Sequence, residues 1–271
     1  QVSIYGIASI GMTFVILLGD IDLSAGSVIT FVNIVAAYLM VNSGFSMTGA
    51  VLVSLVLAVG IGILNGFLVS TIKIPAIIAT FASQTIFEGL SYIICGGVPI
   101  YGFDERFKII GQGYVGPVPI PVIIMACCFA IGAFILNKTY FGRFFYAVGG
   151  NAEAARLSGI KVENIKYLVY ALAGLFSGLA GIVMLSRTNS AQPTAGLGYE
   201  FDVITCVVLG GVSVTGGIGK ISNVIAGVLI IGILTNGMVL MNVSTYTQMV
   251  IKGIVLAAAV GFDSLQNKQR A

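Results

Sequence analysis

The residues best suited to act on another molecule lie in a polar segment, residues 138–166, between long apolar stretches. It carries five basic and two acidic side chains, in a chain with only 8% charged residues. Within it Asn151 stands before Glu153, two alanines follow, and a glycine stands at 159. Asn151 can cap a helix, Glu153 suits its first turn, and Gly159 can end it in a left-handed turn. We expect a slim, capped helix that a soluble partner could grip from one side of a membrane, with a solvated loop that has no partner as the alternative.

The other residues give little indication of a catalytic site or a metal site. The chain has no histidine, which excludes Ser-His and Cys-His catalysis and His-based metal sites. Its four cysteines form no C-x-x-C pair and are expected to be buried free thiols. The glycine-rich residues 210–220 lack the spacing of a phosphate-binding loop. An aspartyl protease within the membrane is disfavoured, because no aspartate lies in a clear span with the usual flanking sequence. We therefore assign no catalytic residue, metal or cofactor to this chain.

The elements that position the polar segment are expected to be membrane helices. Hydrophobic residues form 58% of the chain, mean hydropathy is +1.06, and ten acidic and thirteen basic side chains cannot cover a water-soluble surface. The apolar runs are continuous rather than alternating, which excludes porin-like strands. The fold class is an all-α polytopic membrane protein with about nine helices, some short or broken. The expected segments are 4–18, 26–41, 47–72, 75–94, 119–137, 167–185, 201–214, 221–241 and 247–262.

Lysine and arginine predict the orientation of these helices. If the polar segment is cytoplasmic and the segments alternate, only Arg106, Lys108 and Arg187 fall outside, and Lys252 falls inside the last span. The cytoplasmic side then receives Lys73, Lys138, Arg143, Arg156, Lys161, Lys166, Lys220, Lys268 and Arg270. Residue 1 lies outside and the C-terminus inside. A first helix is therefore expected to precede the chain, which would bring the full protein to about ten.

A weak internal repeat indicates two related halves. LLGDIDLSAGSV at 17–28 echoes VLGGVSVTGGIG at 208–219, and GILNG at 62–66 echoes GILTNG at 232–237. Repeats of this kind often enclose the substrate path of a transporter, although Gly- and Val-rich segments also resemble one another by chance. Within 167–185, glycines at helical spacing predict a tight helix–helix face.

Asp20, Asp22 and Lys220 are expected at the cytoplasmic interface. The two aspartates flank the break between the first two segments, where Asp22 or Ser24 can cap the next helix. The repeat suggests that Lys220 lies close enough to form an ion pair with them. Proton coupling is the alternative for charges at membrane depth.

Several polar side chains interrupt the apolar spans. Thr80, Gln84 and Glu88 are spaced by four and therefore share one helix face. This face is expected to line a translocation path or to bond to a neighbouring helix, because lipid would disfavour it. The repeat-related Asn65 and Asn236 have the same two interpretations.

The outer side offers a candidate docking surface for a soluble protein. Proline and glycine in residues 190–199 indicate a loop there. Glu200 and Asp202 could instead cap the helix that follows. The charged and polar residues assigned to this surface are Asp104, Glu105, Arg106, Lys108, Arg187, Gln192, Glu200 and Asp202.

The motif Glu153-Ala154-Ala155-Arg156-Leu157-Ser158-Gly159 has the form E-A-A-x-x-x-G, which resembles the coupling motif of bacterial ABC importer permeases. Further blocks resemble permeases of ribose-, galactose- and xylose-type ABC importers, and the resemblance covers essentially the whole chain. These blocks are GDIDLSAGS (19–27), IPAIIATFA (74–82), TYFGRFFYAVGGNAEAARLSGI (139–160), SAQPTAGLGYEFDVITCVVLGGVSVTGGIG (190–219) and YTQMVIKG (246–253). The block at 190–219 looks most like ribose permeases. The additional acid Asp20 departs from the family pattern, which leaves its role open.

The resemblance implies a single transmembrane permease domain over residues 1–271, with a type II importer fold similar to the vitamin B12 importer. It implies a homodimer, a cytoplasmic ABC ATPase with two nucleotide-binding domains that holds ATP and Mg, and an extracytoplasmic sugar-binding protein. The coupling loop is 138–166, and the coupling residues are Gly150, Asn151, Glu153, Ala154, Ala155, Arg156 and Gly159. The location would be the bacterial plasma (inner) membrane, with no nucleic-acid partner.

The cargo expected from the resemblance is a monosaccharide, with ribose as the first candidate and no tight sugar site in this chain. A nucleoside or an autoinducer-2-like sugar could use the same scaffold. An ion-coupled secondary transporter would use Asp20, Asp22 or Glu88 instead, and its uptake would be sensitive to an uncoupler.

Overall fold

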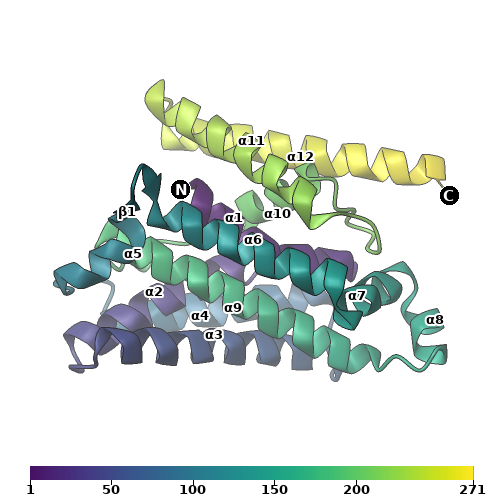
Figure 1. Ribbon diagram of the computed structural model, residues 1–271, viewed down its shortest axis with the longest axis horizontal. Coiled ribbons are helices and arrows are strands. Elements are labelled where there is room, and N and C mark those ends of the chain that lie inside the picture. Colours follow the sequence, from purple (N-terminus) through teal and green to yellow (C-terminus); the bar gives the residue numbers. More distant parts are fainter. Residues whose placement is uncertain (271) are drawn as a thin grey trace.

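The computed structural model describes the backbone of residues 1–270; residue 271 and the side chains of Glu105 and of residues 266–270 lie outside the described part. The chain forms a bundle of helices that run along one common direction (Figure 1). The elements are α1 (Val2–Leu17), α2 (Ala25–Val41), α3 (Met47–Ser70), α4 (Ala76–Cys95), the 3-10 turn η1 (Glu105–Phe107), α5 (Lys108–Gln112), β1 (Tyr114–Val115), β2 (Val118–Pro119), α6 (Ile120–Lys138), α7 (Tyr140–Gly150), α8 (Ala152–Leu157), α9 (Val162–Thr188), α10 (Tyr199–Leu209), α11 (Ile221–Leu240) and α12 (Thr245–Arg270).

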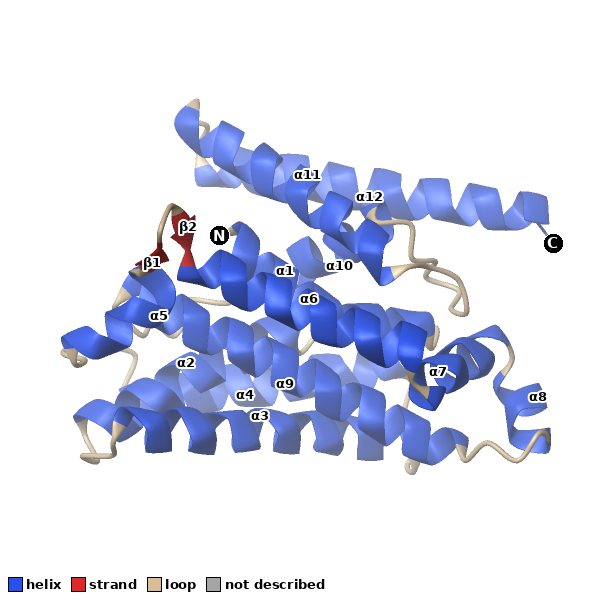
Figure 2. Cartoon of the chain, viewed as in Figure 1, coloured by secondary structure: helices blue, strands red, loops and turns tan. Residues whose placement is uncertain are grey.

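The bundle has two distinct ends. One end carries α5 and a small antiparallel hairpin of β1 and β2, and the other carries α7 and α8 (Figure 2). We call them the α5 end and the α8 end. The long helices connect the two ends, so successive loops alternate between them (Figure 1). This alternation agrees with the parity expected from the sequence.

The membrane class predicted from composition is confirmed. Within residues 1–270, six helices are long and apolar enough to cross a membrane: α3, α4, α6, α9, α11 and α12. The longest of them, α9, has 27 residues and would extend about 40 Å, which exceeds the hydrocarbon core of a bilayer. Helices α1 and α2 are apolar but shorter. Helix α10 has only 11 residues, so the prediction of short or broken helices is also confirmed.

Helix α9 lies at the centre of the bundle, against α1, α2 and α3. Glycines allow this close packing, as their helical spacing predicts. A Cβ atom at Gly174 would overlap the Ala58 carbonyl oxygen, and one at Gly181 would lie 2.6 Å from the Ile29 carbonyl oxygen. On the facing helix, a Cβ at Gly62 would overlap the Tyr170 carbonyl oxygen. The backbones of α3 and α9 are therefore in direct contact.

Two helices begin inside the bundle rather than at its ends. The loop of residues 189–198 leads to the start of α10, where Glu200 is buried, and α2 begins beside it. The Gly196 N–H donates to Thr30 Oγ1 over 2.9 Å. A Cβ at Gly26 would overlap the Glu200 carboxylate and would lie 2.5 Å from the Gly196 carbonyl oxygen, a backbone atom, so glycine allows this approach. The first turns of α2 and α10 thus meet at depth.

Candidate functional site

Helix α8 has the capped form that its sequence predicts. The Asn151 side-chain oxygen accepts from the N–H groups of Glu153 and Ala154 over 3.0 and 2.9 Å, which satisfies two donors of the first turn. Gly159 has a φ of 85°, so the chain leaves α8 through a left-handed turn. The capping prediction is confirmed. A side chain at position 159 would be strained in this conformation.

Most of α8 projects from the bundle. Ala155 is buried and holds the helix to the bundle, whereas Gly150, Glu153, Ala154 and Gly159 are exposed. Leu157, on the last turn, is 82% exposed. Figure 1 shows α8 at the edge of its end, with no other helix of this chain covering it. An apolar tip on a polar, exposed helix is suited to a complementary groove.

An ion pair joins α8 to the start of α9. Arg156 contacts Glu163 of α9 over 2.8 Å and Glu153 over 3.5 Å. Lys73, in the loop between α3 and α4, lies 3.5 Å from the same Glu163. These exposed pairs each contribute little stability, but together they limit how α8 can turn.

The polar segment contains a second helix that the sequence interpretation did not identify. Residues 140–150 form α7, which joins α8 through the single residue Asn151. Its buried face includes Phe145, whose ring centroid lies 5.6 Å from that of Phe14 in α1. The signal that could have revealed an amphipathic helix is the three-residue spacing of Gly142, Phe145 and Val148, which are its buried residues. In addition, α9 begins at Val162, five residues earlier than predicted.

Asp20 has a different partner from the one the repeat suggested. Its carboxylate lies 2.8 Å from Nζ of Lys166, near the N-terminal end of α9. The expected pairing with Lys220 is therefore wrong for Asp20. The echoing segments do meet at the α8 end, but through backbone: the Gly217 N–H donates to the Leu17 oxygen over 2.8 Å. Lys220 is exposed at the start of α11. The repeat therefore located the contact between the breaks but not the charged pair.

Asp22 and its neighbours fasten the break of residues 18–24. The Asp22 carboxylate accepts from the Ser24 N–H and hydroxyl over 2.8 and 2.6 Å, next to the first turn of α2. Asn65 Nδ2 donates to Ser24 Oγ over 2.8 Å, and the Leu23 N–H donates to Thr80 Oγ1 over 3.0 Å. Asn65 therefore bonds to the N-cap residue of the neighbouring helix α2, which was one of its two expected roles, whereas Thr80 bonds to the break itself. They hold α3 and α4 to the break.

Gln84 joins two carboxylates within the bundle. Its Nε2 donates to Glu88 Oε1 over 3.1 Å and to Glu200 Oε1 over 3.2 Å. Gln84 and Glu88 are half-buried, whereas Glu200 is 2% exposed. The prediction that Glu200 lies on an outer docking surface is wrong, because the inward course of residues 189–198 carries it into the bundle. It also makes no side-chain cap on α10.

Asp202 is buried as well, one turn into α10. Its carboxylate lies 2.7 Å from Lys252 Nζ of α12, and the Lys252 ammonium lies 5.8 Å from the Tyr5 ring centroid. This pair was not foreseen, although a lone lysine within an apolar span signals a buried partner. It fastens α12 to the short helix α10.

The α5 end carries the remaining residues assigned to docking. Asp104 and Arg106 are exposed in and beside η1, and Arg187 and Gln192 are exposed near the C-terminal end of α9. Gln112 Nε2 donates to the Arg187 carbonyl oxygen over 3.0 Å, so η1, α5 and the end of α9 form one surface. Glu105 belongs to η1, and its side chain lies outside the described part.

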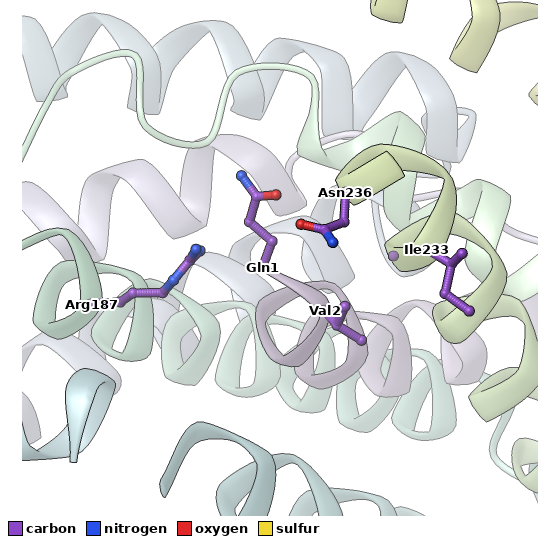
Figure 3. Close-up of a pocket in the computed structure, with 6 residues that line it drawn as sticks. Gln1, Val2, Arg187, Ile233 and Asn236 are labelled. Atoms are coloured by element: carbon purple, nitrogen blue, oxygen red, sulfur yellow. The ribbon is translucent and has the colours of Figure 1, made fainter. Parts of the chain in front are cut away.

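Two adjoining cavities open at this end beside α1 and α9, the first bordered also by α11 and the second by the loop that leads to α10. The first, of about 190 Å³, lies between Gln1, Arg187 and Asn236, whose side chains converge on it (Figure 3). The second, of about 270 Å³, shares Gln1 and Arg187 and extends to Gln192 and Tyr199. Asn236 therefore lies at a polar cavity and not in the position that its repeat partner Asn65 occupies.

Comparisons with known proteins agree with this architecture. The family model described as "Branched-chain amino acid transport system / permease component" matches residues 1–260. The ribose import permease protein of Bacillus subtilis is 46% identical over 97% of this chain and 82% of its own length. The L-arabinose transport system permease protein of Escherichia coli is 43% identical over 99% of this chain and 82% of its own length. The L-arabinose ABC transporter permease protein of Azospirillum brasilense is 38% identical over 100% of this chain and 79% of its own length. No solved structure matches the chain.

The family model spans nearly the whole helical bundle, and these relatives match 97%, 99% and 100% of the chain. The identities are well above the level at which a shared fold is expected. The chain therefore belongs to the branched-chain amino acid transport system / permease component family, as a multi-pass permease subunit of the ABC importer kind and not an enzyme.

Proposed function

We propose that this chain is the membrane subunit of an importer in which α8 docks into a groove of a separate ABC ATPase. The observation that carries the proposal is the exposed, capped helix α8 with Leu157 at its tip. The ATPase would have two nucleotide-binding domains and would hold ATP and Mg. The coupling loop is residues 138–166, of which α7, α8 and the start of α9 are the folded parts.

The α8 end is the cytoplasmic end in this proposal, and the membrane is a bacterial inner membrane. The described basic side chains support that orientation, because lysine and arginine concentrate in cytoplasmic loops. The loops and helix ends there carry Lys73, Lys138, Arg143, Arg156, Lys161, Lys166 and Lys220, against Arg106, Lys108 and Arg187 at the α5 end.

The α5 end would receive a soluble sugar-binding protein. Asp104, Arg106, Arg187 and Gln192 are exposed there and offer both signs of charge, as a complementary docking surface needs. Glu105 belongs to the same proposed surface. The polar cavities at Arg187 and Asn236 lie beside it and would be the mouth of the path that admits the sugar.

The functional unit would contain a second copy of the chain, with the path between the copies. Large apolar side chains on α3, α4 and α12 are exposed, and only lipid or another protein can cover them. Gln84 and Glu88 are half-buried residues of α4, and their side chains would border the path. The cargo would be a monosaccharide, with ribose first, which is supported by the named cargoes of the relatives.

Replacing Leu157 tests the proposed socket. Leu157→Asp should reduce the ATPase that co-purifies with the chain at least about tenfold, because a buried charge without a partner disfavours the complex by more than 1.4 kcal/mol. The matched control is Val115→Asp, since Val115 is also an exposed aliphatic residue (61% exposed) and lies in the hairpin at the α5 end. Equal ATPase recovery with both variants would contradict the proposal.

A further inference from the structure

The end of α7 touches two breaks between helices at one point: residues 18–24, between α1 and α2, and residues 210–220, between α10 and α11. The Leu17 carbonyl oxygen, at the end of α1, accepts from the Gly217 N–H over 2.8 Å. A Cβ atom added to Gly149 of α7 would overlap that same oxygen and would lie 2.6 Å from the Gly217 nitrogen. A Cβ at Gly216 would lie 2.8 Å from both the Gly149 oxygen and the Gly19 nitrogen. We call Leu17, Gly19, Gly149, Gly216 and Gly217 the backbone junction.

No side chain separates the three segments at the backbone junction. Contacts between side chains can yield by changing rotamers, but contacts between backbones can yield only if whole segments move. A displacement of α7 at Gly149 would therefore displace the end of α1 and the residues 210–220 together.

A hydrogen bond adds a second connection beside this contact. The Tyr146 hydroxyl, one turn before Gly149, donates to the Gly219 carbonyl oxygen over 2.8 Å. Gly219 has a φ of 146° and precedes Lys220, the N-cap residue of α11. Tyr146 thus fixes the distance between α7 and the start of α11.

The connection from the C-terminal end of α7 to α8 is short. Asn151 alone separates the two helices: its N–H donates to the Ala147 oxygen of α7, and its side chain caps α8. Phe145 anchors α7 against α1. Helix α7 is therefore a short rigid element with α8 at one end and the backbone junction along its side.

The segments that meet at the backbone junction continue to the buried hydrogen bonds and the ion pair inside the bundle. The break after Leu17 continues to Leu23 and Ser24, which bond to Thr80 of α4 and Asn65 of α3. Residues 210–220 follow α10, whose first turns carry Glu200 and Asp202 with their partners on α4 and α12. Both breaks therefore connect to the helices that would enclose the path.

We propose that α7 transmits movement of α8 to both breaks at once, and that Tyr146 and Gly149 are positioning residues of the import cycle. This inference rests on the proposed function, because α8 must be driven by an ATPase. It assigns to these two residues a role in coupling that differs from binding the ATPase, which belongs to α8.

The test measures how much sugar crosses for each ATP hydrolysed. The complete complex of permease, ATPase and sugar-binding protein is placed in liposomes, with D-ribose as the probe. Tyr146→Phe removes only the hydroxyl that bonds to Gly219, and the ratio of D-ribose imported to ATP hydrolysed should fall about fivefold, at the lower end for coupling between sites. The matched control is Tyr246→Phe, because Tyr246 lies on α12 outside the coupling loop and is 82% exposed, and this variant should keep the wild-type ratio.

Gly149→Ala provides the stronger change, because the junction has no room for a methyl group. It should lower the same ratio more than Tyr146→Phe does, while the ATPase still co-purifies. Unchanged ratios in both variants would overturn the inference. Loss of the ATPase from either variant would also overturn it, since the residues would then seat the partner instead of transmitting its movement. If no ATPase binds even the wild-type chain, the proposed function itself fails, which is a distinguishable result.

Discussion

Lys252→Met is expected to remove most of the folded protein from the membrane. The change leaves the Asp202 carboxylate, which is 7% exposed, without the ammonium group 2.7 Å away. An unpaired buried charge of this kind costs about 3–5 kcal/mol, a large part of the 5–15 kcal/mol that stabilises a typical fold. Helix α12 should be affected most, because its apolar surface is almost entirely open and the pair is its tie to α10.

The yield of monodisperse protein in detergent and its thermal unfolding midpoint measure this effect. A second variant, Lys252→Met with Asp202→Asn, should recover most of the loss, because no charge then remains unpaired. The matched control is Lys138→Met, since Lys138 is exposed at the end of α6. If Lys252→Met unfolds at the same temperature as Lys138→Met, the pair does not stabilise the bundle.

Gly62→Val is expected to separate the two most closely packed helices. The Gly62 position faces the Tyr170 carbonyl oxygen, and Gly174 of α9 faces the Ala58 oxygen in return. Both obstacles are backbone atoms, so the valine cannot be accommodated by a rotamer change. We expect a loss of about 3 kcal/mol or more, the upper part of the range for overpacked interiors.

Gly60 supplies the control for this change, because it lies on α3 two residues away and a Cβ there meets no atom within 4 Å. Gly60→Val makes the same change in helix propensity as Gly62→Val, so the difference between the variants isolates the contact with α9. The unfolding midpoint of each variant in detergent gives that difference. Identical midpoints would mean that α3 and α9 do not meet as described.

The membrane class and most helices could be predicted from the sequence, because apolar runs and lysine distribution are local properties of the chain. The cap of α8 was equally accessible, since Asn151, Glu153 and Gly159 act within a few residues of one another. Helix α7 was not predicted. Its helical pattern lies within a segment whose polarity is typical of a loop, and its stability depends on Phe145 packing against α1.

The buried partners could not be predicted, because they depend on how distant segments approach in space. Asp20 bonds to Lys166, 146 positions away, where the repeat suggested Lys220. Glu200 was expected outside because a loop precedes it, but that loop turns into the bundle and places Glu200 beside Gln84. The order of helices along the chain indicates at which end of the bundle a loop lies. It does not indicate how far that loop extends into the bundle.

Uptake by reconstituted liposomes tests the central claim most directly. Permease, ATPase and sugar-binding protein are combined, D-ribose is supplied with the binding protein, and ATP is supplied on the side of α8. We predict that D-ribose crosses only when all three proteins and ATP are present, and that an uncoupler has no effect. Uptake by the permease alone that follows a proton gradient and stops with an uncoupler would contradict the account.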